Sequence, residues 1–308
     1  MHLAVYCPFL GSALLGATAP ALARRLPPAT ASRLLVLGSA LAAASTAVAL
    51  AVLTLTLVGE LPGVAAIGHR SSAVLDASDP VPGAVAVLAL VLVTVLAVRA
   101  LRLVLLRGRA LRAARALCRE LGGSPGQLVV VDDDVEPLAV PTSGGRIVAS
   151  RTALAALPVA ERRALLLHEA AHLDHHHVVF RLVAELAGAL DPLQARVAGA
   201  VVHATERWAD EEAARGLGDR AVVARSLARS QLRAPAAAAA PRWAGVALRS
   251  GGSSVVGRVR ALLEPAPRQR PAAVLLAALL VAGTVGTAVH ASVDADSWFD
   301  SAAQVSSR

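Results

Sequence analysis

Charged residues are absent from four long stretches of this chain, and these stretches define its first predicted elements. The windows 3–23, 34–58, 81–98 and 271–293 contain no Asp, Glu, Lys or Arg. A helix needs about 20 apolar residues to cross the hydrocarbon core of a bilayer, and each window is near or above that length. The pattern therefore predicts four membrane-spanning helices.

A cleaved signal peptide is the alternative interpretation of the first window. Signal peptides carry basic residues ahead of their apolar core. In this chain the first basic residue, Arg24, follows the apolar run. The order favours a span that is retained.

The stretch after the third window alternates between basic, apolar and turn-forming residues, as in a water-soluble domain. The third window continues into the basic segment 99–119, and we expect that helix to end at Gly122 and Gly123, because glycine adopts the left-handed conformation of a helix cap. The β-branched run 128–131 predicts a strand. The acidic run 132–134 lacks the spacing of a calcium loop and is interpreted as a solvated turn.

A β-hairpin is predicted next. Segments 136–140 and 146–149 flank the turn sequence 141–145, which contains two glycines. Pro137 and Pro141 cannot donate a backbone hydrogen bond, so the first strand is expected at a sheet edge.

Helical patterns follow the hairpin. Pro158 suits the first position of a helix, and the pattern continues to about His177. Segment 178–190 is too short and too charged to span a bilayer and is predicted to be a packed or membrane-skimming helix. After a break at Asp191 and Pro192, segment 195–217 predicts another helix, and 234–270 is interpreted as a linker with weak helices.

The distribution of charge gives these segments an orientation. The net charge is +8, and the basic residues outnumber the acidic ones by 30 to 22. Segments 24–33 and 99–270 are net basic, whereas 59–80 and 294–308 are net acidic. By the positive-inside rule the basic segments lie in the cytoplasm and both termini lie outside it. Membrane topology accounts for the basic balance, so it requires no direct contact with nucleic acid.

These patterns predict a multi-pass α-helical protein of the cell membrane with a cytoplasmic α+β domain. The expected parts are a two-span N-terminal hairpin (1–58), an extracytoplasmic loop (59–80), a third span (81–106), a cytoplasmic domain (107–233), a linker (234–270), a fourth span (271–293) and a short extracytoplasmic tail (294–308). Cys7 and Cys118 form no metal-binding pair and are interpreted as packing residues.

The predicted chemistry is centred on the segment 168–172, His-Glu-Ala-Ala-His. On a helix, positions i and i+4 lie on one face, so His168 and His172 can bind one zinc ion. Glu169 can then take a proton from zinc-bound water. The alternative is a helix whose polar end holds these residues by chance.

A third ligand is expected on a second helix, because a catalytic zinc usually has three protein ligands and one open position. Glu206 is the candidate, and Asp210 lies four residues later on the same face. Asp210 can accept the remaining N–H of a ligating histidine, with His168 the favoured partner. The alternative is an ordinary acidic helix face.

Other histidines lie near this motif. His203 precedes Glu206 by three residues and is a candidate for lining the cleft. His175 and His176 follow His172 by three and four residues, but polar side chains are common where a helix ends, and this role is favoured over ligation.

With these motifs beside N-terminal spans, the chain resembles the membrane metallopeptidases of the BlaR1/MecR1 type (peptidase family M56), relatives of the HtpX/Ste24 (M48) peptidases. The resemblance implies that the cytoplasmic α+β domain at 107–233 is a zincin-like zinc metalloprotease domain. It further implies that His168, His172 and Glu206 bind one Zn²⁺ per chain and that Glu169 is the general base. It also implies that the edge strand near 136–140 holds the substrate backbone. Antibiotic-sensing members carry a large extracellular domain after the last span, and here only 294–308 follows it.

The expected function is a membrane-bound zinc endopeptidase acting on a protein or peptide substrate, with a BlaI/MecI-like repressor in a signalling pathway as the first candidate. One alternative is a general membrane-protein quality-control protease of the HtpX type. An alternative of another class is a non-catalytic signalling scaffold with a structural metal, which would need a closed site of four ligands.

Overall fold

The computed structural model is mostly helical. It describes residues 4–59, 83–120, 122, 126–132, 138–140, 145–233 and 254–268, with isolated positions between 271 and 293. Its elements in chain order are η1 (Ala4–Tyr6), α1 (Cys7–Arg25), α2 (Pro28–Gly59), α5 (Gly83–Glu120), β1 (Leu128–Val131), β2 (Leu138–Val140), β3 (Arg146–Ser150), α6 (Arg151–Ala155), α7 (Val159–Asp174), α8 (His177–Leu190), η2 (Pro192–Gln194), α9 (Ala195–Leu217), α10 (Arg220–Arg233) and α11 (Val255–Leu263).

Two of the described helices, α2 over Pro28–Leu55 and α5, are long and apolar enough to cross a membrane. The basic segment after the third window continues that helix, so α5 is unbroken over 38 residues. The first window forms α1, a helix of 19 residues that is not among these two candidate spans. The loop expected at 59–80 lies outside the described residues from residue 60 on, as do most of the window 271–293 and the tail 294–308.

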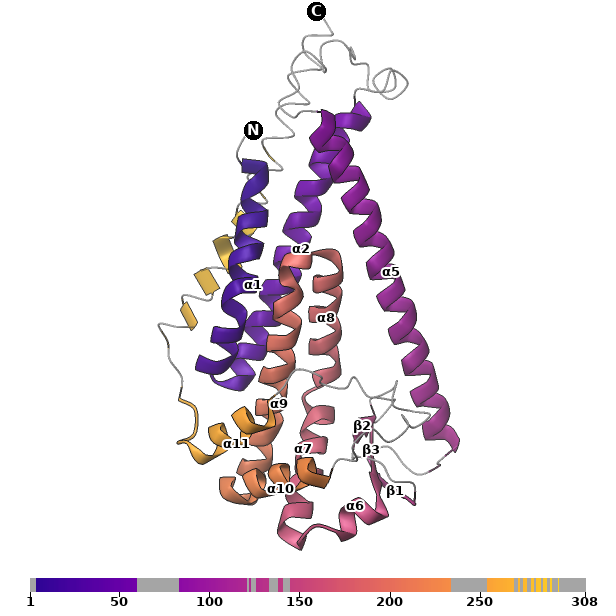
Figure 1. The fold of residues 1–308 in the computed structure, drawn as a ribbon, viewed down its shortest axis with the longest axis vertical. Coiled ribbons are helices and arrows are strands. Elements are labelled where there is room, and N and C mark those ends of the chain that lie inside the picture. The colour runs from indigo at the N-terminus through magenta and orange to yellow at the C-terminus, as the bar shows by residue number, and fades with distance from the viewer. Residues whose placement is uncertain are drawn as a thin grey trace, which may run out of the picture.

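A small sheet lies beside the C-terminal end of α5 (Figure 1). Its strand order is β1-β3-β2, with β1 parallel and β2 antiparallel to β3. The predicted strand at 128–131 and the predicted hairpin are confirmed, and β2 lies at an edge as its neighbouring prolines indicate. Val140 and Val148 pack on Ala114 and Cys118 of α5. The packing role predicted for Cys118 is thereby confirmed.

The helix opened by Pro158 ends earlier than expected. α7 stops at Asp174, and His176 has a φ of 52°, in the left-handed region. This reversal starts α8 at His177, so the prediction of one helix to His177 is wrong at its end. The turn carries no Gly or Pro, and a non-glycine residue rarely adopts this conformation, so the sequence pattern could not indicate it.

Helices α8 and α9 form a hairpin that packs against α1 and α2, and the four helices share one apolar core (Figure 1). α9 has the predicted bounds, and α8 is the packed helix expected at 178–190. The hairpin approaches α1 tightly at Gly16, where an added Cβ would clash with the carbonyl oxygen of Leu193. Asp191 accepts hydrogen bonds from Ser12 and Thr46, which fastens the tip of the hairpin.

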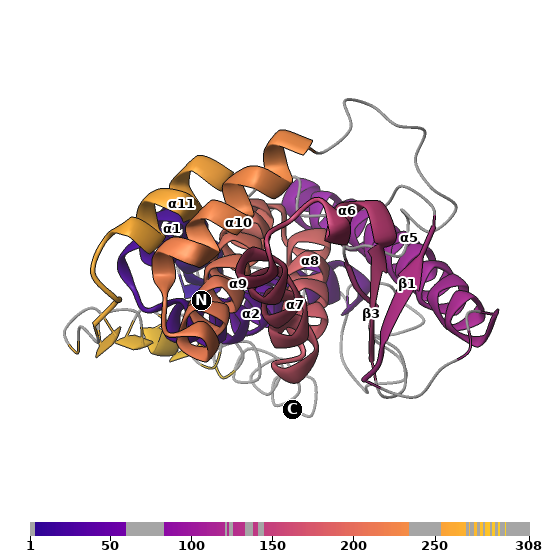
Figure 2. The same ribbon diagram turned by 90° about the horizontal axis from the view of Figure 1, so that it is seen from below.

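Helices α10 and α11 pack on α7 and α9, on the side away from the sheet (Figure 2). Their core includes Ala164, Ala213, Val223 and Leu262. α11 lies within 234–270, the segment interpreted from the sequence as a linker. Its buried face packs on the helices that carry the expected site, so this part of the segment is structural.

Candidate metal centre

Two helices bring the predicted metal ligands together. His168 and His172 are one turn apart on α7, and their Nε2 atoms lie 3.2 Å from each other. Glu206 of α9 lies opposite, with Oε2 at 3.6 Å from Nε2 of His168 and Oε1 at 3.5 Å from Nε2 of His172. One donor atom from each residue lies within 4.8 Å of the others, which makes this a group that could hold a metal ion.

Asp210 lies where the sequence predicts it. Its Oδ1 is 3.0 Å from Nδ1 of His168, and it is buried one turn beyond Glu206 on the same helix. A carboxylate only accepts at neutral pH, so the Nδ1 atom of His168 carries the proton. The Nε2 atom of His168 faces Glu206 and His172, and on this side a metal ion would take the place of the Nε2 proton.

His177 is the corresponding neighbour of His172, and the sequence did not indicate it. The two Nδ1 atoms lie 2.8 Å apart. If His172 donates from Nδ1, its Nε2 is free for a metal and His177 carries its own proton on Nε2. That Nε2 is buried and has no hydrogen-bond partner in the described structure. Burial lowers the pKa of His177 to about 3, aided by the charge of Arg181, so this residue is neutral.

Two arginines hold the carboxylate of Glu206. Arg181 of α8 donates from Nη2 to Oε1 at 2.6 Å, and Nη1 of Arg258 on α11 lies 2.6 Å from Oε2. Arg258 also makes two hydrogen bonds to Asp210, at 2.8 Å and 2.7 Å. One guanidinium therefore connects the candidate ligand to the residue that orients His168. Sequence reasoning missed both arginines, because nothing distinguishes them among the many in this chain.

Glu169 is buried beside the cluster and faces the sheet. Its Oε2 accepts a hydrogen bond of 2.8 Å from the backbone N–H of Ala139, in the edge strand β2. Burial raises the pKa of Glu169 to about 7, and the nearby carboxylate of Glu206 adds to the effect. A carboxyl group with a pKa near the working pH can accept a proton and return it.

The pKa values of the two histidines in the cluster are shifted in opposite directions. Burial alone would lower the pKa of His168, but hydrogen bonds to Asp210 and Glu206 raise it to about 9. Burial dominates at His172 and lowers its pKa well below the usual value. Burial would raise the pKa of Glu206, but the hydrogen bond to His168 and the charge of Arg258 lower it, so the carboxylate is ionised.

The other histidines of interest lie outside this group. His175 stacks on Trp208 and lies 3.2 Å from Glu212. His176 is close to the carbonyl oxygen of Leu173 at the end of α7. His203 is half-buried on α9, one turn before Glu206, and it is not in the metal-binding group of the described residues.

The donor set fits zinc. Two imidazole nitrogens and one carboxylate oxygen are a ligand combination of catalytic zinc sites. Each imidazole also has a partner at its other nitrogen, which fixes the ring before a metal binds. With Glu169 beside the donors, the arrangement can bind a divalent metal and move a proton next to it.

Comparison with known proteins gives one family. Residues 108–240 match the model of Peptidase family M48, a range that starts in α5 and includes the sheet, α7, α8, α9 and α10. No curated protein and no solved structure matches the chain. The resemblance to BlaR1/MecR1-type peptidases of family M56 is not confirmed. The matched region contains the metal-binding cluster, and two of the described helices are apolar enough to span a membrane. Together they support a membrane-associated metalloprotease similar to the M48 (HtpX/Ste24-like) peptidases.

Proposed function

We propose that this protein is a zinc-dependent endopeptidase of the cell membrane that cleaves membrane or misfolded proteins, as expected of a quality-control protease of the HtpX type. The observation that carries the proposal is the convergence of His168, His172 and Glu206 within 4.8 Å inside the region that matches family M48. The family match favours this function over repressor cleavage in a signalling pathway, for which no observation argues.

The roles follow from the contacts. His168, His172 and Glu206 would hold the zinc ion, with His168 oriented by Asp210 and His172 by His177. Zinc in such a site polarises a peptide carbonyl and acidifies water. Glu169 would accept the proton of the attacking water and deliver it to the leaving amine.

The substrate backbone would bind along β2. This strand pairs with β3 on one side, and the Ala139 N–H on its other side reaches Glu169. An extended substrate that adds to an edge strand is held by its main chain, with little demand on its sequence. Such binding suits a protease with many substrates.

A catalytic role is favoured over a structural metal. Structural zinc sites are closed by four protein ligands, whereas catalytic sites keep one position open. In the described part of the chain the group has three members.

The basic segments around the site favour a cytoplasmic location for it, with both termini on the other side of the membrane.

The test compares the wild type with the Glu169→Gln variant, both purified in detergent. The proposal expects about one zinc per chain in both proteins and cleavage of an unfolded protein by the wild type alone. Stoichiometric zinc without cleavage by the wild type, on soluble and membrane substrates alike, would favour the scaffold alternative.

A further inference from the structure

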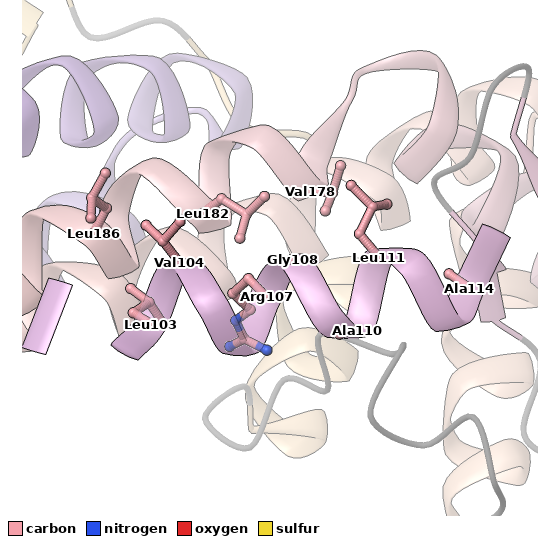
Figure 3. A pocket seen from close by; sticks show the side chains of 10 residues that line it. All are labelled: Leu103, Val104, Arg107, Gly108, Ala110, Leu111, Ala114, Val178, Leu182 and Leu186. Carbon is pink, nitrogen blue, oxygen red and sulfur yellow. The ribbon is translucent and has the colours of Figure 1, made fainter. Parts of the chain in front are cut away.

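An apolar groove runs between α5 and α8 (Figure 3). Its cavity volume is about 250 Å³. The walls are formed by Leu103, Val104 and Leu111 of α5 and by Val178, Leu182 and Leu186 of α8. Over these positions the groove follows about 12–16 Å of helix, at 1.5 Å per residue.

The groove offers no uncompensated charge. Arg107 is the charged residue in its lining, and this guanidinium donates two hydrogen bonds to Glu185, at 2.8 Å and 2.6 Å. The pair neutralises itself at the edge of the groove. A charged or strongly polar occupant would therefore lose its hydration without gaining a partner, whereas an apolar one gains buried area.

One side of the groove is continuous with the apolar surface of α5. Val104 lines the groove and is also exposed, as are its neighbours Leu101, Leu105 and Leu106 on this candidate membrane span. The third span expected from the sequence ends at residue 106, so these side chains would lie at its cytoplasmic end, next to the bilayer. An apolar segment could thus pass from the bilayer into the groove without crossing water.

The other end of the groove approaches the metal cluster. Val178 follows His177, whose Nδ1 lies 2.8 Å from His172. Ala114, also in the lining, packs on Val140 at the end of the edge strand β2. The groove therefore lies between the exposed apolar surface of α5 and the strand beside Glu169.

We propose that this groove binds an apolar segment of the polypeptide substrate, drawn from the membrane, and presents the adjoining residues to β2 for cleavage. The inference rests on the proposed peptidase function and specifies where a membrane-protein substrate binds. Continuity with β2 favours a polypeptide over a lipid acyl chain, because only a polypeptide has further residues that can reach Glu169.

Gly108 allows the groove to be filled without disturbing its walls. It lines the cavity, and a Cβ added there meets no atom within 4 Å. Gly108→Phe should therefore occupy the groove. Gly199→Phe is the matched control, because Gly199 is also inside a helix and open to a Cβ, but lies on the exposed face of α9.

The first measurement uses two substrates with the same cleavable sequence, in detergent micelles. One is a short soluble peptide, and the other carries an apolar segment of about 20 residues before the cleavable sequence. We expect Gly108→Phe to lower the ratio of kcat/KM for the apolar substrate to kcat/KM for the soluble one at least tenfold, through KM, and Gly199→Phe to leave the ratio unchanged. An unchanged ratio in Gly108→Phe would overturn the proposal.

The second measurement is independent of cleavage. A photoreactive diazirine side chain replaces Leu182 in the Glu169→Gln protein, reconstituted in liposomes with the apolar substrate. Crosslinks to the substrate segment that Gly108→Phe abolishes support the groove, even if the wild type proves inactive. Crosslinks to lipid alone, or to substrate regardless of Gly108→Phe, would overturn it. Failure of the peptidase function and failure of the groove are thus distinguished.

Discussion

Arg258 and Asp210 form a buried bidentate ion pair, although 48 residues separate them in the sequence. The same guanidinium lies against Glu206. α11 is thereby tied to both acidic residues of the cluster, and the segment that precedes the last apolar window becomes part of the candidate metal centre.

Removing this tie should weaken metal binding. In Arg258→Ala the carboxylates of Asp210 and Glu206 lose the cation that holds them, and we expect zinc affinity or activity to fall about 10–100-fold, as for other residues that orient metal ligands. Zinc content after dialysis against a weak chelator measures the effect. Arg260→Ala, an exposed position on the same helix, is the control and should retain its zinc. Equal zinc retention in both variants would contradict the assigned role.

His177 should support His172 in the same way. His177→Phe keeps an aromatic ring next to Trp208 and Phe180 but removes the contact with Nδ1 of His172. We expect about tenfold weaker zinc binding with the fold retained. Zinc titration together with circular dichroism checks this. Unchanged affinity would show that His172 needs no partner there.

Glu169 is expected to be essential for cleavage and dispensable for the metal. Glu169→Gln preserves the shape of the side chain and its hydrogen bond from Ala139, but it cannot take a proton. Proteolysis should fall at least about a hundredfold, the low end for a general base, while zinc stays near one per chain. Activity near that of the wild type would refute the proposed mechanism.

The tight approach of α1 to η2 gives a prediction about stability. In Gly16→Ala the new Cβ would clash with the Leu193 carbonyl oxygen, so one element has to move. Overpacking of this kind costs about 1–3 kcal/mol, and we expect the apparent Tm in detergent to fall by several degrees. Gly199→Ala, where a Cβ meets nothing, should not lower Tm. An equal Tm for both variants would show that the approach is easily relaxed.

The sequence predicted those features that have a local signal. The spacing of His168 and His172 follows from helix geometry, and the run 128–131 and the helix 195–217 follow from their apolar patterns. Glu206 and Asp210 could be selected because they lie four residues apart on one helix. The placement of Asp210 next to His168 agrees with the partner expected for it.

The remaining features depend on tertiary contacts without a local signal. Arg258 is one arginine among many, in a segment whose sequence predicts a linker with weak helices. Only the packing of α11 brings it to Asp210. His177 contacts His172 because the chain reverses at His176, a residue that seldom adopts a positive φ. The packing of α8 and α9 against the N-terminal helices depends on complementary surfaces such as Gly16 and Leu193.

The most direct test of the account is the zinc content of four variants, measured by mass spectrometry after dialysis of the detergent-purified proteins against a weak chelator. Glu206→Ala should lose most of its zinc, because two imidazoles and water remain. Asp210→Ala should lose less, with affinity reduced about 10–100-fold, and His203→Ala and His175→Ala should keep the metal. If His203→Ala loses the zinc and Glu206→Ala retains it, the proposed ligand set is wrong.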